Sequence, residues 1–107
     1  MKRFEDVVNV DFFDKYLPLV KPAYGVMDKD GKVRYSVLEE MFRSLNGGDN
    51  PNRFVYALIH GIQNLLPAWN TPPKYRGKEE AIYKECLDTG KTWKEVLGYK
   101  IDEDIVL

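Results

Sequence analysis

The clearest pattern along the chain lies between residues 50 and 67, where apolar side chains recur at helical spacing. Asn50 suits the capping position, Pro51 suits the first helical turn, and Pro67 cannot continue the hydrogen-bond ladder. Successive residues of a helix are rotated by about 100°, which places the apolar residues of this segment on one broad arc that is expected to face the core. These residues are Phe54, Val55, Leu58, Ile59, Ile62, Leu65 and Leu66. The remaining arc is polar, contains no carboxylate, and consists of Asn52, Arg53, Tyr56, His60, Gln63 and Asn64.

A second helix is predicted directly after Ser36, because Ser36 and Glu39 have the spacing of a capping box. Its apolar residues follow at i, i+3, i+4 and i+7, namely Leu38, Met41, Phe42 and Leu45. The sequence Asn46-Gly47-Gly48 is expected to end it.

The C-terminal third predicts two more helices. Residues 78–89 would form the first, closed by Gly90, with an apolar face of Ala81, Ile82, Cys86 and Leu87. Thr92 and Glu95 repeat the capping-box spacing before a short helix that stops at Gly98 and buries Trp93, Val96 and Leu97.

The N-terminal third is expected to combine a helix with a hairpin. Asp11 can cap a short helix that ends before Pro18. Residues 24–27 and 32–35 flank the turn Asp28-Lys29-Asp30-Gly31, in which Gly31 can supply the positive φ of a tight hairpin. The predicted fold is therefore α+β and mainly helical, a single domain over residues 1–107 in which one β-hairpin at about residues 24–35 packs on four to five helices.

Composition predicts an ordered, soluble chain. Of 107 residues, 44% are hydrophobic and 31% charged, which is far from the signature of disorder, and the net charge of −1 predicts no strong attraction to nucleic acid. Acidic residues follow the basic pair at the start, where a signal peptide would need an apolar run. A cytoplasmic protein with no membrane span is expected, and the single Cys86 fits a reducing compartment.

Three motif-like segments fail on named residues. The turn Asp28–Gly31 is similar to half of an EF-hand loop, but Val26 and Val37 occupy the first and twelfth ligand positions. Gly90-Lys91-Thr92 lacks the earlier glycine of a P-loop. The two C-terminal helices are spaced like a helix-turn-helix motif, but an acidic tail follows them and would repel a duplex. A helical hairpin in which Trp93 fills the core is the simpler interpretation.

Sequence gives no signature of catalysis. His60 is the single histidine, so a His-based metal cluster is not expected, and no cofactor is predicted. Cys86 lies on an apolar helix face, where cysteine usually acts as a small hydrophobe. An enzyme with a dispersed site around His60 is kept as one alternative.

The polar arc of the 50–67 helix is the best candidate for a working surface, although another segment could also cover it and satisfy its hydrogen bonds. Arginine and tyrosine are enriched at interface hot spots, and two exposed loops could widen the surface. The predicted partner-binding residues are Arg53, Tyr56, His60, Gln63, Asn64, Trp69, Tyr75 and Arg76. The first hypothesis is a non-enzymatic regulator, inhibitor or assembly subunit that binds a protein. The second is nucleic-acid binding through Arg53, His60, Lys74, Tyr75 and Arg76.

Overall fold

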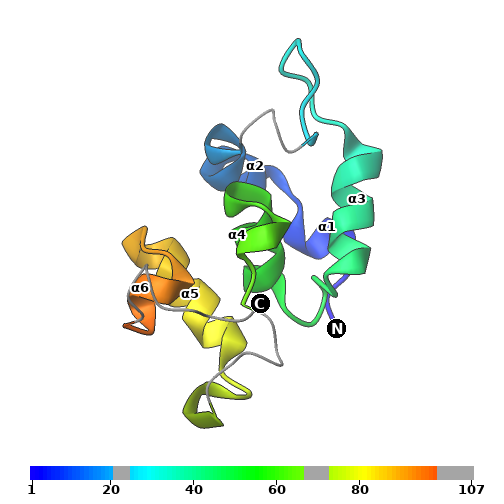
Figure 1. Ribbon diagram of the computed structural model, residues 1–107. Helices are drawn as coiled ribbons and strands as arrows, with labels where there is room; N and C mark the ends of the chain where they lie inside the picture. Colours follow the sequence, from blue (N-terminus) through cyan, green and yellow to red (C-terminus); the bar gives the residue numbers. More distant parts are fainter. Residues whose placement is uncertain (21–24, 67–72, 99–107) are drawn as a thin grey trace.

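The computed structural model describes residues 1–20, 25–66 and 73–98 of the chain. Figure 1 shows short helices joined by turns. None of the helices within these ranges is long and apolar enough to cross a lipid bilayer. The α-helices are α1 (Phe4–Val7), α2 (Val10–Tyr16), α3 (Tyr35–Ser44), α4 (Pro51–His60), α5 (Glu79–Thr89) and α6 (Trp93–Val96). Single 3₁₀ turns are η1 (Leu17–Leu19), η3 (Ile62–Asn64) and η5 (Pro73–Tyr75).

The predicted β-hairpin, and with it the α+β class, is wrong: the described residues contain helices and no strand. Only the predicted turn at residues 28–31 forms. In this turn Gly31 has φ +81°, and its N–H donates to the Asp28 carbonyl at 3.0 Å. Beyond it, Met27 and Val33 make one isolated antiparallel bridge. The second arm cannot extend into a ladder because α3 begins at Tyr35. Residue 24, at the start of the predicted first arm, lies outside the described residues.

Helix α4 lies at the centre of the described structure, between α3 and α5 (Figure 1). The Phe54 ring of α4 packs edge-on against Phe42 of α3, with centroids 5.4 Å apart, and stacks on Phe12 of α2 at 6.0 Å. On another side of α4, Tyr56 packs against Tyr83 of α5 at 5.0 Å. Aromatic pairs of this kind add to the free energy of burial, so α4 joins the N-terminal and C-terminal helices through one hydrophobic cluster.

The start of α4 is confirmed and its end is not. Asn50 Oδ1 accepts the Arg53 N–H at 3.1 Å, and Pro51 occupies the first turn. The helix stops at His60, because Gly61 takes φ +95° and breaks the helical path. Ile62 therefore leaves the predicted apolar arc and is 55% exposed. The other predicted core positions of this segment are buried, except for half-buried Ile59.

Two other predicted caps are misplaced. Helix α3 begins at Tyr35, and its N-cap residue Arg34 makes no side-chain cap bond, so the capping box expected at Ser36 is wrong. Helix α2 is capped by Asn9, whose Oδ1 accepts the Phe12 N–H, and not by Asp11. In both cases the N-cap position lies two residues earlier in the chain than the sequence pattern predicted.

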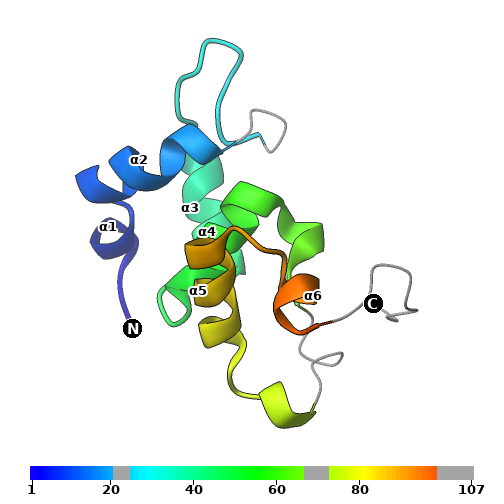
Figure 2. The same ribbon diagram turned by 90° about the vertical axis from the view of Figure 1, so that its left-hand side faces the viewer.

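The C-terminal helices largely agree with the sequence. Helix α5 ends at Thr89, and Gly90 follows in the left-handed conformation. Thr92 Oγ1 accepts the Glu95 N–H at 3.2 Å, and Trp93 is buried. Figure 2 shows α6 beside α5, which precedes it in the chain. Ala81, placed on the apolar face by spacing, is exposed.

Candidate functional site

The polar arc predicted on the 50–67 helix does not form one continuous surface, because Tyr56 interrupts it. Tyr56 has no exposed area, and its ring contacts both Tyr83 and His60. Burial raises the pKa of its hydroxyl to about 12, against the opposing effect of a backbone hydrogen bond with Trp93. Tyr56 is therefore part of the core and unavailable to a partner in this structure.

Arg53 remains at the N-terminal end of α4, where it borders a cavity. The side chain is half-buried, and its Nε atom is buried with no hydrogen-bond partner in the described part of the chain. The cavity has a volume of about 250 Å³ and is lined by Asn50, Arg53, Leu66, Glu79 and Tyr83. These five residues are called the Arg53 site below. The site joins the first turns of α4 and α5 with the segment that follows η3.

Most polar groups around the Arg53 site are already hydrogen-bonded. The Tyr83 hydroxyl donates to the Leu66 carbonyl at 3.0 Å and also accepts the Leu66 N–H. Burial raises the Tyr83 pKa to about 12, while the Leu66 hydrogen bond and the nearby Arg53 charge oppose that shift. Asn50 Oδ1 caps α4.

Arg53 and Glu79 are the charged groups of the site. Both lie in the described part of the chain, yet they form no ion pair, and three other carboxylate–cation pairs lie elsewhere. The cavity therefore has a guanidinium donor and a carboxylate acceptor that do not satisfy one another.

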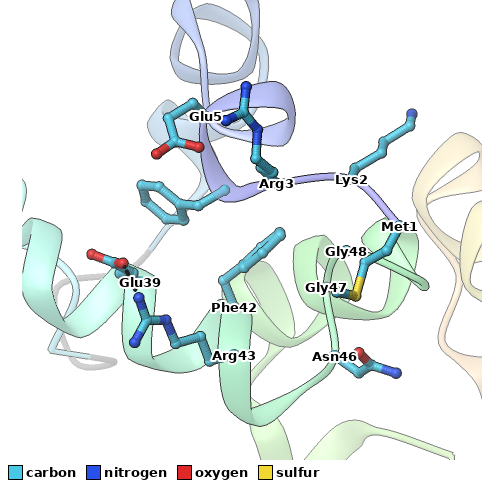
Figure 3. Close-up of a pocket in the computed structure, with 11 residues that line it drawn as sticks. Met1, Lys2, Arg3, Glu5, Glu39, Phe42, Arg43, Asn46, Gly47 and Gly48 are labelled. Carbon is cyan, nitrogen blue, oxygen red and sulfur yellow. Dashed lines mark hydrogen bonds and ion pairs between the residues drawn. The ribbon is translucent and has the colours of Figure 1, made fainter.

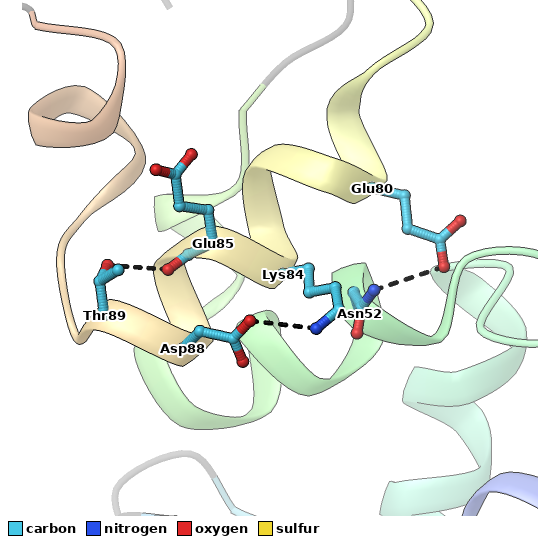
Figure 4. Close-up of polar contacts among 6 residues, drawn as sticks. All are labelled: Asn52, Glu80, Lys84, Glu85, Asp88 and Thr89. Atoms are coloured by element: carbon cyan, nitrogen blue, oxygen red, sulfur yellow. Dashed lines mark hydrogen bonds and ion pairs between the residues drawn. The ribbon is translucent and has the colours of Figure 1, made fainter.

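The first turns of α4 and α5 also approach one another outside the cavity. Asn52 Nδ2 lies 3.5 Å from Glu80 Oε1, at the limit of a hydrogen bond (Figure 4). Further along α5, Lys84 pairs with Asp88 at 3.0 Å, and Thr89 Oγ1 donates to the Glu85 carbonyl at 2.7 Å. The Lys84–Asp88 and Thr89–Glu85 contacts lie within α5, whereas the Asn52–Glu80 contact joins α4 to α5.

The other end of the predicted arc lies at the C-terminus of α4. His60 is half-buried with its ring 4.5 Å from the Tyr56 ring, and the Asn64 side-chain amide donates to its carbonyl. Gln63 is exposed and borders a cavity of about 220 Å³ lined also by Val37, Met41, Ala57, Gly61 and Ile62. That cavity is mainly apolar and contains no carboxylate. Gln63 and Arg53 thus border different cavities, and His60 lines neither of these two cavities.

The loop residues of the predicted surface differ in exposure. Trp69 lies outside the described residues. Tyr75 is half-buried against the core, with the Lys74 ammonium 5.0 Å from its ring centroid, and Arg76 is exposed. Lys74, Arg76 and Lys78 together form an exposed basic turn that leads into α5.

A larger cavity at the N-terminus was missed by the sequence reasoning (Figure 3). It has a volume of about 410 Å³, and its lining includes Lys2, Arg3, Glu39, Phe42 and Arg43. The close approach of two segments creates it, because the Lys2 N–H donates to the Gly48 carbonyl at 3.0 Å. Its charges are mixed, and Arg43 is paired with Glu39 at 2.7 Å. The adjacent glycines at 47 and 48 were the available sequence clue, but they were interpreted only as a helix stop.

Cys86 is fully buried on α5. Burial, with a smaller effect from the neighbouring Glu85 carboxylate, raises the thiol pKa to about 11. The thiolate needed for nucleophilic attack is thus disfavoured at neutral pH. Within the described ranges, no three His, Cys, Asp or Glu side chains gather where they could hold a metal ion.

Comparison with known proteins gives no relative: no family model matches the chain, and neither do curated proteins or solved structures.

Proposed function

We propose that this chain is a non-enzymatic binding protein that contacts a partner protein through the surface where α4 and α5 begin. The observation that carries the proposal is the Arg53 side chain, which borders a cavity of about 250 Å³ and whose buried Nε has no hydrogen-bond partner within residues 1–20, 25–66 and 73–98. A regulator, an inhibitor and an assembly subunit would each act through such a contact with a partner protein.

The energetics of the free protein support a site that is completed on binding. A buried donor without an acceptor costs about 1–3 kcal/mol relative to one that is paired. A partner that inserts an acceptor beside Arg53 would remove that cost and add a charge-assisted hydrogen bond. Arginines in largely desolvated pockets are frequent hot spots of protein interfaces.

The surroundings of the site favour a partner larger than a small solute. Glu79 follows directly on Lys78, so the basic turn of Lys74, Arg76 and Lys78 continues to the edge of the cavity. A partner that covers the cavity would also meet these exposed cations. Acidic groups on that partner would complement the basic turn and speed association.

Affinity enrichment from the native host tests the proposal with three immobilised proteins: wild type, Arg53→Ala and the control Arg34→Ala. Arg34 is exposed and distant in sequence from the site, with one long contact of 3.4 Å to the Gly25 carbonyl. We expect a partner recovered by wild type and Arg34→Ala to be lost with Arg53→Ala, while circular dichroism shows all three folded. Equal recovery by both variants would refute a role for Arg53.

Nucleic-acid binding is a second candidate, favoured by the basic turn. Lys74, Arg76 and Lys78 are exposed within five residues that contain no carboxylate. Binding through phosphate contacts would weaken steeply as salt rises. Fluorescence anisotropy with single-stranded and duplex oligonucleotides therefore tests it, with a Lys74→Gln/Arg76→Gln/Lys78→Gln variant as the comparison. If wild type binds neither oligonucleotide at low salt, this candidate is eliminated.

A further inference from the structure

The unpaired charges of the Arg53 site define what a ligand group must offer. Arg53 and Glu79 line the same cavity, and the buried Nε of Arg53 has no hydrogen-bond partner among the described residues. The two side chains do not pair with one another. A complementary group must therefore supply an acceptor to Arg53 and be tolerated by the negative charge of Glu79.

Three common side-chain chemistries meet this requirement to different extents. A carboxylate would satisfy Arg53 but would be repelled by Glu79, and an ammonium group would satisfy Glu79 but be repelled by Arg53. An amide is neutral and carries both a carbonyl acceptor and an N–H donor. It is the group that can satisfy both residues at once.

We propose that the Arg53 site recognises an amide group of a partner polypeptide, with the carbonyl accepting from Arg53 and the N–H donating to Glu79. This inference rests on the proposed function, since it names the chemistry taken up at the same site. The amide belongs either to an Asn or Gln side chain or to the main chain of the partner.

The other walls of the cavity are consistent with this selectivity. The Tyr83 hydroxyl is committed to Leu66, and the Asn50 side-chain oxygen is committed to the cap of α4. Specificity is thus left to Arg53 and Glu79. Leu66 is 3% exposed and supplies an apolar wall for the carbon atoms beside the amide. The volume of about 250 Å³ exceeds the ~30 Å³ that one water occupies in the liquid, so a small amide fits.

The test follows the Arg53 Nε–H directly by two-dimensional ¹H–¹⁵N NMR of the full chain. The resonance is assigned by its loss in Arg53→Lys, which keeps the charge and removes Nε. Three probes of similar size are titrated: acetamide for a side-chain amide, N-methylacetamide for a peptide bond, and acetate as the charged control. We expect one or both amides to shift the Arg53 Nε–H saturably, and acetate to shift it less at equal concentration.

Glu79→Gln gives the sharper comparison, with Glu80→Gln as its matched control. Glu80 is the next residue of α5, points about 100° away, and does not line the cavity. Glu79→Gln replaces a charged acceptor by a neutral one, so amide binding to this variant should weaken about tenfold. Acetate binding should strengthen in the same variant because the repelling charge is gone. Glu80→Gln should change neither.

Each remaining outcome overturns the amide assignment. A larger response to acetate than to both amides would assign the site to a carboxylate, and the absence of any response would remove the ligand site. Equal effects of Glu79→Gln and Glu80→Gln would exclude Glu79 as the acceptor. The proposed function fails separately, when Arg53→Ala retains the partner protein in the enrichment experiment.

Discussion

The Tyr83 hydroxyl satisfies both backbone groups of Leu66, donating to its carbonyl at 3.0 Å and accepting its N–H. Both residues are buried, and the segment from η3 to Leu66 is thereby attached to α5. This pair forms one wall of the Arg53 site. The site is consequently held by the same contact that stabilises the loop.

Tyr83→Phe should lower the free energy of unfolding. The variant keeps the ring but leaves the Leu66 N–H and carbonyl buried without partners, which costs about 1–3 kcal/mol for an unsatisfied group. Urea unfolding followed by circular dichroism measures the difference. Tyr35→Phe is the control, because Tyr35 is 57% exposed. Equal midpoints for the two variants would contradict the role given to the Tyr83 hydroxyl.

The protein should lose stability at alkaline pH as its buried tyrosines ionise. Burial is the main cause that raises the pKa values of Tyr56 and Tyr83 from 10.0 to about 12. A group whose pKa is higher in the folded state stabilises the fold below its unfolded pKa, and this contribution is lost as pH rises through the folded pKa. The loss should therefore develop between pH 10 and 12.

Absorbance of tyrosinate during a pH titration checks this expectation. Tyr56 and Tyr83 should titrate toward pH 12, together with the loss of helical circular dichroism. The Tyr83→Phe variant should remove one of the two late steps. If all seven tyrosines of the chain ionise in one early step, the burial of these two hydroxyls is contradicted.

Cys86 should resist thiol reagents in the folded protein. It has no exposed area, and burial raises its pKa to about 11, so both access and thiolate content are low at neutral pH. Reaction with a chromogenic disulfide should be slow in buffer and fast in denaturant. Fast reaction of the native protein, at the rate of a free thiol peptide, would show that α5 opens readily.

Gly48→Ala should detach the N-terminal segment from the turn after α3. A Cβ at position 48 would lie 2.4 Å from the Lys2 carbonyl oxygen, and this backbone atom has to move. Overpacking of this kind typically costs about 1–3 kcal/mol. The Lys2 amide, which donates to the Gly48 carbonyl, should exchange with solvent faster. Ser44→Ala, at an exposed position of α3, should leave that exchange rate unchanged.

The helices most visible in the sequence were those delimited by local chemistry. The sequence correctly predicted that Asn50 and Thr92 cap the starts of α4 and α6 and that Gly90 ends α5. A cap or a left-handed glycine depends only on residues a few positions away in the chain. The end of α4 could not be predicted in this way. Gly61 can be accommodated in a helix or can end one, and tertiary packing selects between these conformations.

The predicted hairpin failed for a related reason. The turn at Asp28–Gly31 is local and forms, with Asp28 Oδ1 accepting the N–H groups of Asp30 and Lys32. Extension into two paired strands requires continued cross-chain hydrogen bonds. Helix α3 begins at Tyr35, so the residues predicted for the second arm end before such a strand can form.

The sequence by itself determined the capped starts of α4 and α6, the stop of α5 at Gly90 and most of the buried residues of these helices, because these depend on spacing along one chain. The tertiary structure decided which polar residues are available. It buried Tyr56 under α5 and α6, separated Gln63 from Arg53 at the break of Gly61, and brought Glu79 to the same cavity as Arg53. Contacts between residues far apart in sequence arise from packing of whole helices, and helical spacing within one segment carries no information about them.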